Sequence, residues 1–199
     1  MSPGAVVIID SGGANLASLR FALDRLGARS VVSADPAVVA AAPRVLLPGV
    51  GAAADAMSRL RAARLIETLR GLRQPMLGIC LGMQLLFTHS EEGDTEGLGL
   101  IAGTIRRIPG SVDLPVPHMG WNTCEPRQPD PLLEDIGERD YFYFVHSYAA
   151  PVGDCTSAAV TYGTALSAVV RQGHIHGVQF HPERSGAPGA RVLRNFLKL

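Results

Sequence analysis

Residues 76–87 read Met-Leu-Gly-Ile-Cys-Leu-Gly-Met-Gln-Leu-Leu-Phe, and this segment contains the strongest local signal in the chain. Its pattern predicts a buried strand that runs into Cys80, a tight turn, and a helix over Leu81–Phe87. A nucleophile on such a strand-to-helix turn has a strained backbone, and Gly78 and Gly82, two residues away on either side, avoid the clashes that side chains would cause. The spacing is that of a nucleophile elbow with cysteine in place of serine.

Cys80 is therefore a candidate nucleophile. The N-terminal end of the following helix would stabilise the thiolate, and the backbone N–H of Leu81 would point at the oxygen of an attacked carbonyl. Most free cysteines are small buried hydrophobic residues, and the elbow by itself leaves that interpretation open.

Residues 177–183 read Gly-Val-Gln-Phe-His-Pro-Glu and supply a candidate base for this cysteine. In an extended chain His181 and Glu183 face the same side, so their side chains can meet. Pro182 disfavours helical geometry at His181 and favours that extension. Glu183 would then orient the imidazole and stabilise the imidazolium, which is the role of the acid in a catalytic triad.

Strand-like and helix-like patterns alternate through the first half of the chain. Strands are expected at Ala5–Ile9, Val31–Val32, Val45–Leu47 and Met76–Ile79. Helices are expected at Asn15–Leu26 and, with an interruption, at Ala53–Leu69. This alternation predicts an α/β fold in which a mostly parallel central sheet is flanked by helices on both faces.

Glycine and proline are frequent in the region from Gly93 to Asp140, where only Thr104–Ile108 has a strand pattern. Further strands, expected as antiparallel additions to the sheet, are Tyr141–Val145, Ser157–Thr161, Leu166–Arg171 and Ile175–Phe180. Val192–Leu197 predicts a closing helix. Because no repeat or linker interrupts the 199 residues, we expect one domain over residues 1–199.

Composition limits the possible functions. Hydrophobic residues make up 47% and charged residues 18% of the chain, and this composition excludes a chain that is disordered over its whole length. Lysine plus arginine and aspartate plus glutamate are 18 each, so the formal net charge is zero and a nucleic-acid partner bound through a basic surface is not expected.

The apolar runs and the cysteines indicate the compartment. No apolar run reaches the ~18 residues of a membrane helix, and no secretory signal is evident, so no membrane association is expected. Cys80, Cys124 and Cys155 lack the close spacing of a zinc motif or a disulfide framework. These features predict a cytoplasmic protein without a bound metal.

The G-x-C-x-G-x-Q segment that ends at Gln84 and the H-P-E segment of residues 181–183 are both intact. Together they resemble the class I (triad) glutamine amidotransferases, and the resemblance covers nearly the whole chain. It implies that Cys80 is the nucleophile, His181 the general base and acid, and Glu183 the orienting carboxylate. It also implies that Gln84 helps to hold the substrate, L-glutamine.

Further segments resemble one family within that class, the glutaminase subunits of imidazole glycerol phosphate synthase in histidine biosynthesis. They are Asp10–Leu16, Pro48–Gly51, Pro117–Asn122 and Val145–Tyr148. The chain departs from the family's pattern, near the expected partner face, at Ser11, Ala14, Arg184 and Gly186.

The resemblance assigns roles to these segments. It implies an oxyanion hole formed by Gly49, Val50, Gly51 and Leu81. It implies a glutamine site formed by Gln84, His146, Ser147 and Tyr148. It implies a partner interface that includes Asn15, Met119, Trp121 and Arg184.

The implied reaction is the hydrolysis of glutamine without a cofactor. The implied partner in a heterodimer is a (β/α)8-barrel synthase subunit, which receives the ammonia through a channel and makes imidazole glycerol phosphate and aminoimidazole carboxamide ribotide. Such a barrel typically needs ~250 residues, so it must be a separate chain.

Three other functions use the same motifs. A glutaminase subunit of another pathway, such as anthranilate or pyridoxal phosphate synthesis, is disfavoured by Pro48–Gly51 and His118–Asn122. A stand-alone cysteine hydrolase would turn over its substrate without a partner. A regulatory module without catalysis would have lost members of the triad, and all three are present.

Overall fold

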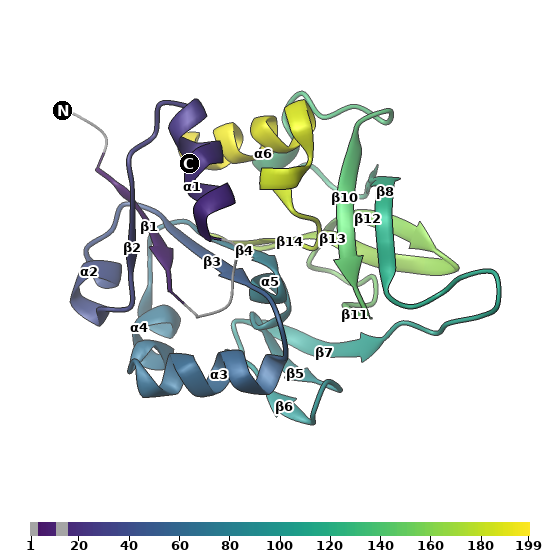
Figure 1. The fold of residues 1–199 in the computed structure, drawn as a ribbon, viewed down its shortest axis with the longest axis horizontal. Helices are drawn as coiled ribbons and strands as arrows, with labels where there is room; N and C mark the ends of the chain where they lie inside the picture. The colour runs from purple at the N-terminus through teal and green to yellow at the C-terminus, as the bar shows by residue number, and fades with distance from the viewer. Residues whose placement is uncertain (1–3, 11–15) are drawn as a thin grey trace.

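A computed structural model describes residues 4–10 and 16–199 and contains one large central sheet (Figure 1). The sheet has eight strands in the order β2-β1-β3-β4-β14-β13-β12-β9. Their bounds are β1 Val6–Ile9, β2 Ser30–Ser33, β3 Val45–Gly49, β4 Met76–Cys80, β9 Glu125–Pro126, β12 Thr156–Tyr162, β13 Thr164–Gln172 and β14 Ile175–Val178. Strands β2, β1, β3, β4 and β14 are parallel, and β13, β12 and β9 follow in antiparallel pairing.

Helices cover both faces of the sheet, as the alternating pattern predicts (Figure 1). On one face α1 (Leu16–Arg25) and α6 (Gly186–Lys198) pack onto side chains such as Val6 and Ile8. On the other face α3 (Ala53–Ala62) and α4 (Leu65–Gly71) pack onto the alternate side chains of the same strand. A short helix, α2, spans Pro36–Ala40. The two apolar clusters hold the parallel strands rigidly between them.

The interruption expected within Ala53–Leu69 is confirmed. Helices α3 and α4 are separated at Arg64, whose φ of +58° lies in the left-handed region and ends one helix before the next begins. The closing helix is also confirmed, although α6 begins six residues before the predicted Val192, at Gly186 with φ +60°.

Two smaller sheets lie beside the central one (Figure 1). Strand β10 (Tyr141–His146) pairs antiparallel with β8 (His118–Thr123). A four-stranded sheet has the order β11-β7-β5-β6, and its strands span Tyr148–Ala149, Ile101–Arg107, Phe87–Ser90 and Thr95–Glu96. The central sheet therefore holds only part of the second half of the chain.

Two predictions about these strands are wrong. The strand expected at Tyr141–Val145 does not join the central sheet, because β10 pairs only with β8. The strand expected at Ile175–Phe180 is not simply an antiparallel addition. Strand β14 lies between β4 and β13 and runs parallel to β4, with Gly177 opposite Gly78.

The predicted length of the helix over Leu81–Phe87 is also wrong. Helix α5 spans only Leu81–Gln84, and the chain enters β5 at Phe87. Backbone N–H groups from residues 98–101 donate to the carbonyl oxygens of residues 85–87, so those carbonyls are used by a neighbouring segment instead of a longer helix. Strands β5, β6, β8, β9 and β11 were not predicted.

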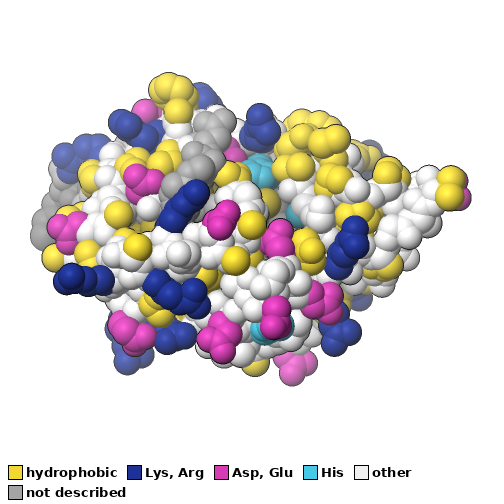
Figure 2. Space-filling model, turned by 60° about the horizontal axis from the view of Figure 1, so that its bottom comes forward, with side chains coloured by type: hydrophobic (Ala, Val, Ile, Leu, Met, Phe, Trp, Pro, Cys, Tyr) yellow, Lys and Arg dark blue, Asp and Glu magenta, His cyan; other side chains and the backbone are white. Residues whose placement is uncertain are grey.

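None of the helices in the described residues is long and apolar enough to cross a membrane. On the face in Figure 2, basic and acidic side chains are interspersed, and neither sign covers a large area. This distribution agrees with the equal totals of the two kinds of charge.

Candidate active site

The turn after β4 has the tight geometry that the sequence predicts. Cys80 has φ +54° and ψ −114°, a backbone conformation that residues other than glycine rarely adopt. A Cβ atom built on Gly78 would lie 2.6 Å from the carbonyl oxygen of Gly82, and one on Gly82 would lie 1.7 Å from that of Leu47. The backbones of β3, β4 and α5 therefore approach more closely than any larger residue would permit.

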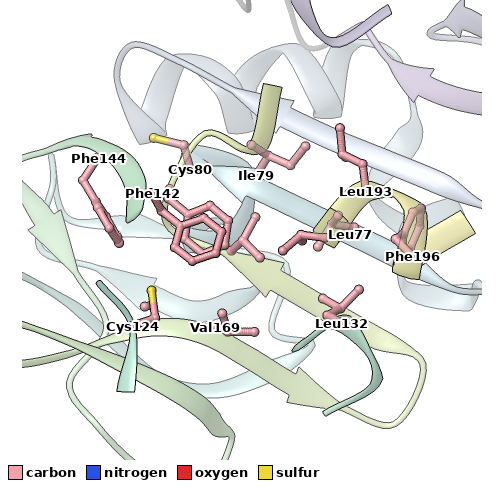
Figure 3. Packing of buried hydrophobic residues seen from close by; sticks show 14 of the residues in the cluster. Leu77, Ile79, Cys80, Cys124, Leu132, Phe142, Phe144, Val169, Leu193 and Phe196 are labelled. Atoms are coloured by element: carbon pink, nitrogen blue, oxygen red, sulfur yellow. The ribbon is translucent and has the colours of Figure 1, made fainter. Parts of the chain in front are cut away.

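Cys80 lies at the margin of the apolar core, and its sulfur points away from Leu77 and Ile79 (Figure 3). The side chain lines a cavity of about 310 Å³. The remaining lining residues are Val50, Gly51, Leu81, Gln84, Glu92, Pro117, Val145, His146, Ser147, Tyr148 and His181. The cavity lies at the carboxyl ends of β4 and β14, where ligands collect in open α/β sheets.

His181 and Glu183 meet, as predicted. The distance from His181 Nδ1 to Glu183 Oε1 is 2.9 Å, and both side chains are 8% exposed. The backbone differs from the prediction because Glu183 lies in a 3₁₀ turn, η2 (Pro182–Arg184). Only His181 itself, with φ −97° and ψ 97°, keeps the extended conformation that the following proline favours.

The surroundings of His181 favour its charged form. Burial lowers the pKa of the imidazole, but hydrogen bonding and charge from Cys80 and Glu183 outweigh burial and raise the pKa to about 10. Within the described residues, Nε2 is buried and makes no hydrogen bond of regular geometry. Catalytic hydrogen bonds often tighten only when substrate binds.

A chain of hydrogen bonds connects three residues that line the cavity, Gln84, Tyr148 and His146. Gln84 Nε2 donates to the carbonyl oxygen of Tyr148 at 2.8 Å and to Gln179 Oε1 at 3.0 Å. The same Tyr148 oxygen lies 2.8 Å from His146 Nδ1, and His146 Nε2 lies 3.1 Å from His118 Nδ1. Since a carbonyl only accepts, His146 Nδ1 carries a proton and His118 donates to its Nε2.

Both of these histidines are uncharged at neutral pH. Burial lowers the pKa of His118 to about 4. Burial also lowers the pKa of His146 to about 4, against the raising effect of its bond to Tyr148. His181 is therefore the one histidine at this site whose pKa is raised.

The segment predicted to form the oxyanion hole runs along the cavity. Val50, Gly51 and Leu81 line it, and Gly49 lies just behind, opposite Cys80 in the β3–β4 register. A Cβ on Gly49 would lie 2.9 Å from the backbone nitrogen of Gly82, so this position requires glycine. The φ of Gly51 is +87°, which also favours glycine.

Most of the residues predicted to face a partner form one exposed group. Met119 is 66% and Trp121 is 56% exposed, and Trp121 packs edge-on against Tyr143 at 5.8 Å between ring centroids. The Arg184 guanidinium lies 5.6 Å from the centre of the same tyrosine ring. Ser11, Ala14 and Asn15 lie outside the described residues.

Two side chains at this site were not predicted. Glu92 reaches the cavity, and its Oε2 accepts from the backbone N–H of Ala53 at 2.9 Å. No motif marks this glutamate in the sequence. Gln179 is fully buried and contacts Cys80; a polar residue within an apolar strand is a signal that could have identified it.

No group of three or more histidine, cysteine, aspartate or glutamate side chains that could hold a metal occurs among residues 4–10 and 16–199. The reactive side chains that line the cavity are the thiol of Cys80, the imidazoles of His146 and His181 and the carboxylate of Glu92.

The family model described as glutamine amidotransferase class-I matches residues 7–199. The chain is 55% identical to a protein named imidazole glycerol phosphate synthase subunit HisH from Xanthomonas euvesicatoria pv. vesicatoria (strain 85-10), covering 98% of this chain and 97% of that one. It is 52% identical, with the same coverage, to a protein of the same name from Xylella fastidiosa (strain Temecula1 / ATCC 700964).

Solved structures share the fold. One described as a glutamine amidotransferase has a TM-score of 0.76 at 20% identity and covers 98% of each chain. A chain of the PurLQS structure from Thermotoga maritima has a TM-score of 0.70 at 17% identity, again over 98% of each chain.

Proposed function

The chain belongs to the class-I glutamine amidotransferase family, and from that premise we propose how its cavity releases ammonia from L-glutamine. The identity of more than half of its residues to subunits named HisH assigns it as the glutaminase subunit of imidazole glycerol phosphate synthase, in histidine biosynthesis. The observation that carries the mechanism is the 2.9 Å contact of Glu183 with His181, which lines the same cavity as Cys80.

The reaction runs in two halves. His181 takes the proton of Cys80, and the thiolate attacks the carboxamide carbon of glutamine. Backbone N–H groups of Leu81 and of the Gly49–Gly51 segment stabilise the oxyanion. The imidazolium then protonates the departing nitrogen, which leaves as ammonia and a γ-glutamyl thioester remains. Water activated by His181 cleaves the thioester, releasing glutamate and the free thiol. Glu183 orients the imidazole throughout.

The substrate is held by other residues that line the cavity. Both amide hydrogens of Gln84 are engaged, so its Oε1 is the atom with capacity for a further hydrogen bond and can accept from the substrate. The Glu92 carboxylate provides a counter-charge for the α-ammonium group of glutamine. His146, Ser147 and Tyr148 shape the remaining side of the cavity.

The exposed group at Met119, Trp121 and Arg184 supports a partner interface, because tryptophan and arginine are enriched among interface hot spots. We propose that it docks a (β/α)8-barrel synthase subunit in a heterodimer, which takes the ammonia through a channel and performs the lyase step. Residues 1–199 then make up one glutaminase domain. Asn15 belongs to this proposed interface.

The same segment that supplies the oxyanion donors can regulate the reaction. Glycines on both sides of Val50 let the intervening peptide rotate, so that either an N–H or a carbonyl oxygen faces the oxyanion. Loss of one donor typically lowers the rate ~10²–10³-fold. We propose that the docked partner favours the N–H orientation when its own ligand binds, so that ammonia is released only when it is needed.

The test compares glutamine hydrolysis by the isolated chain, by the complex with the barrel subunit, and by the complex with that subunit's ligand. The complex of Cys80→Ala is expected to make product from ammonium salts but not from glutamine. Product formation from glutamine by this variant would exclude Cys80 as the nucleophile. Equal rates in the three states of the unchanged protein would exclude gating, and full activity without any partner would favour a stand-alone hydrolase.

A further inference from the structure

Gln179 is a buried polar residue that the proposed mechanism does not use. It follows β14, two residues before His181, and its side chain is fully enclosed. A polar side chain in such a place must satisfy its hydrogen bonds within the protein, so its partners show what it does. Those partners are Gln84 on one side and the sulfur of Cys80 on the other.

The direction of each hydrogen bond is fixed by one backbone atom. The Tyr148 carbonyl oxygen only accepts, so the group that Gln84 turns toward it is the NH₂. The second hydrogen of that NH₂ then goes to Gln179, which must present its oxygen to Gln84. The NH₂ of Gln179 is consequently the group that faces Cys80, at 3.8 Å from nitrogen to sulfur. No choice of amide orientation is left open.

The sulfur has a second contact of opposite character. Cys80 Sγ lies 3.8 Å from the carbonyl oxygen of Val145 and can donate to it only while the thiol is protonated. Once the proton leaves, that carbonyl repels the negative sulfur. The Gln179 contact changes the other way, because an N–H donor binds an anion more strongly than a neutral acceptor. Gln179 therefore favours the thiolate, while Val145 favours the thiol.

We propose that Gln179 is a positioning residue for the glutaminase reaction: it holds the Cys80 sulfur as a thiolate through Nε2 and fixes the Gln84 amide through Oε1. The inference rests on the proposed function and adds a residue to it. One rigid side chain thus connects the nucleophile with the group that receives the substrate. The Gln179 amide therefore positions both the Cys80 sulfur and, through Gln84, the carboxamide carbon of the substrate.

The main test variant is Gln179→Met, which keeps the length of the side chain and removes both hydrogen bonds. The readout is the rate at which iodoacetamide alkylates Cys80 in the full-length chain as a function of pH, followed by peptide mass spectrometry. We expect the midpoint of this profile to move up by about one pH unit and the rate at pH 7 to fall about tenfold. A matched control is Gln172→Met, at the exposed end of β13, which should leave the profile unchanged.

Gln84→Met separates the two halves of the proposal. It removes the partner of Gln179 Oε1 but not the donor to sulfur, so the KM for glutamine should rise while the alkylation profile stays near that of the unchanged chain. Gln179→Met should lower kcat as well as raise KM. The same titratable groups surround the sulfur in both variants. They are His181 with Glu183 behind it, His146 on β10, and Glu92, which lines the same cavity.

The alkylation readout needs no glutamine turnover, so the proposed function and this inference can fail separately. If Cys80 of the unchanged chain is alkylated no faster than the half-buried Cys155, Cys80 is not an activated nucleophile and the proposed function is wrong. If Cys80 reacts preferentially but Gln179→Met leaves its profile unmoved, only the role of Gln179 is overturned. Should Gln179→Met not fold, Gln179→Asn, which keeps the amide but is one methylene shorter, must show the same upward shift.

Discussion

Two clusters beside the central sheet each combine a nucleophile-type side chain, a histidine and a carboxylate. One is Cys80, His181 and Glu183 beside the cavity. The other consists of Ser157 on β12, His176 on β14 and Asp130 just before η1 (Pro131–Leu133), and all three are buried. In residue types alone, the second cluster resembles a serine hydrolase triad as closely as the first resembles a cysteine one.

The order of the groups distinguishes the two clusters. In the first, the imidazole lies between the sulfur and the carboxylate. In the second, the carboxylate is in the middle: Ser157 Oγ donates to Asp130 Oδ2 at 2.5 Å, while His176 Nδ1 lies 3.8 Å from Oδ1 and has no hydrogen-bond partner in the described part of the chain. His176 thus cannot take a proton from Ser157, and none of the three residues lines the cavity.

The pKa values of the two histidines, His176 and His181, also differ. Burial lowers the pKa of His176 to about 4, although the charge of Asp130 acts in the opposite direction. At His181 the neighbouring groups outweigh burial, and the pKa rises to about 10. Access to the cavity and the order of the three groups therefore distinguish the proposed triad from the buried cluster, which joins η1 to the sheet.

Replacing each histidine should give the largest contrast. His181→Asn is expected to lower glutamine hydrolysis by the complex at least ~10⁴-fold, because removing the base of a triad disables the nucleophile as well. His176→Asn should leave turnover close to that of the unchanged protein. Steady-state release of glutamate measures both. Comparable losses in the two variants would mean that the buried cluster takes part in the reaction.

Replacing Glu183 or Asp130 should give the next largest contrast in turnover. Glu183→Gln is expected to reduce turnover ~10²–10⁴-fold, because the imidazolium loses its counter-charge and its orientation. It should also lower the pKa of His181, which would appear as a shift of the corresponding limb of the kcat profile toward lower pH. Asp130→Asn should leave that profile in place. A profile unaffected by Glu183→Gln would contradict the orienting role.

These contrasts also show how much the sequence could predict. The parallel half of the sheet follows from local pattern, because β1, β3 and β4 are buried along their whole length and α1 and α3 each have an apolar stripe. Strand β2, at the edge of the sheet, is only partly buried. The elbow was predictable because Gly78 and Gly82 are required by backbone approach at that turn. The His181–Glu183 contact was predictable from their spacing, even though the turn that produces it is 3₁₀.

The rest depended on contacts between segments distant in sequence. Strand β8 contains Gly120 with φ +144° and polar or exposed side chains, so it has no strand-like hydrophobic pattern. Helix α5 ends early because residues 98–101 bond to the carbonyls after it. Glu92 reaches the cavity through its bond to Ala53, 39 residues away. No local pattern contains this information.

The free energy of unfolding should depend on different histidines at acid and at alkaline pH. Because His176 and His146 have pKa values of about 4 in the folded chain, against about 6.5 when unfolded, only the unfolded chain takes up their protons as the pH falls below 6.5. The free energy of unfolding should therefore fall by about 2–3 kcal/mol per histidine between pH 6.5 and 4. Urea titrations across this range should show a shallower acid loss for His176→Asn.

His181 acts in the opposite direction. Its raised pKa stabilises the fold fully below pH 6.5, and that contribution is lost as the pH rises through about 10. His181→Asn should therefore flatten the alkaline limb and leave the acid limb unchanged. An acid limb that is flattened by His181→Asn and unaffected by His176→Asn would reverse the assignment of the two clusters.

The smallest expected effect is the coupling inside the buried cluster. Ser157 donates to an oxygen of Asp130 that is enclosed by the protein, and the other carboxylate oxygen accepts from the backbone N–H of Leu132 at 2.9 Å. A hydrogen bond to a buried charged group contributes about 1.5–3 kcal/mol. A double-mutant cycle of Ser157→Ala and Asp130→Asn should yield a coupling free energy in this range.

The exposed ion pair of Lys198 and Glu134 provides the control, at about 0–1 kcal/mol, because water screens it. If the buried pair coupled no more strongly than the exposed pair, the Ser157–Asp130 bond would not be what ties η1 to the sheet. A loss of glutamine turnover greater than the loss of folded protein would instead make the cluster functional.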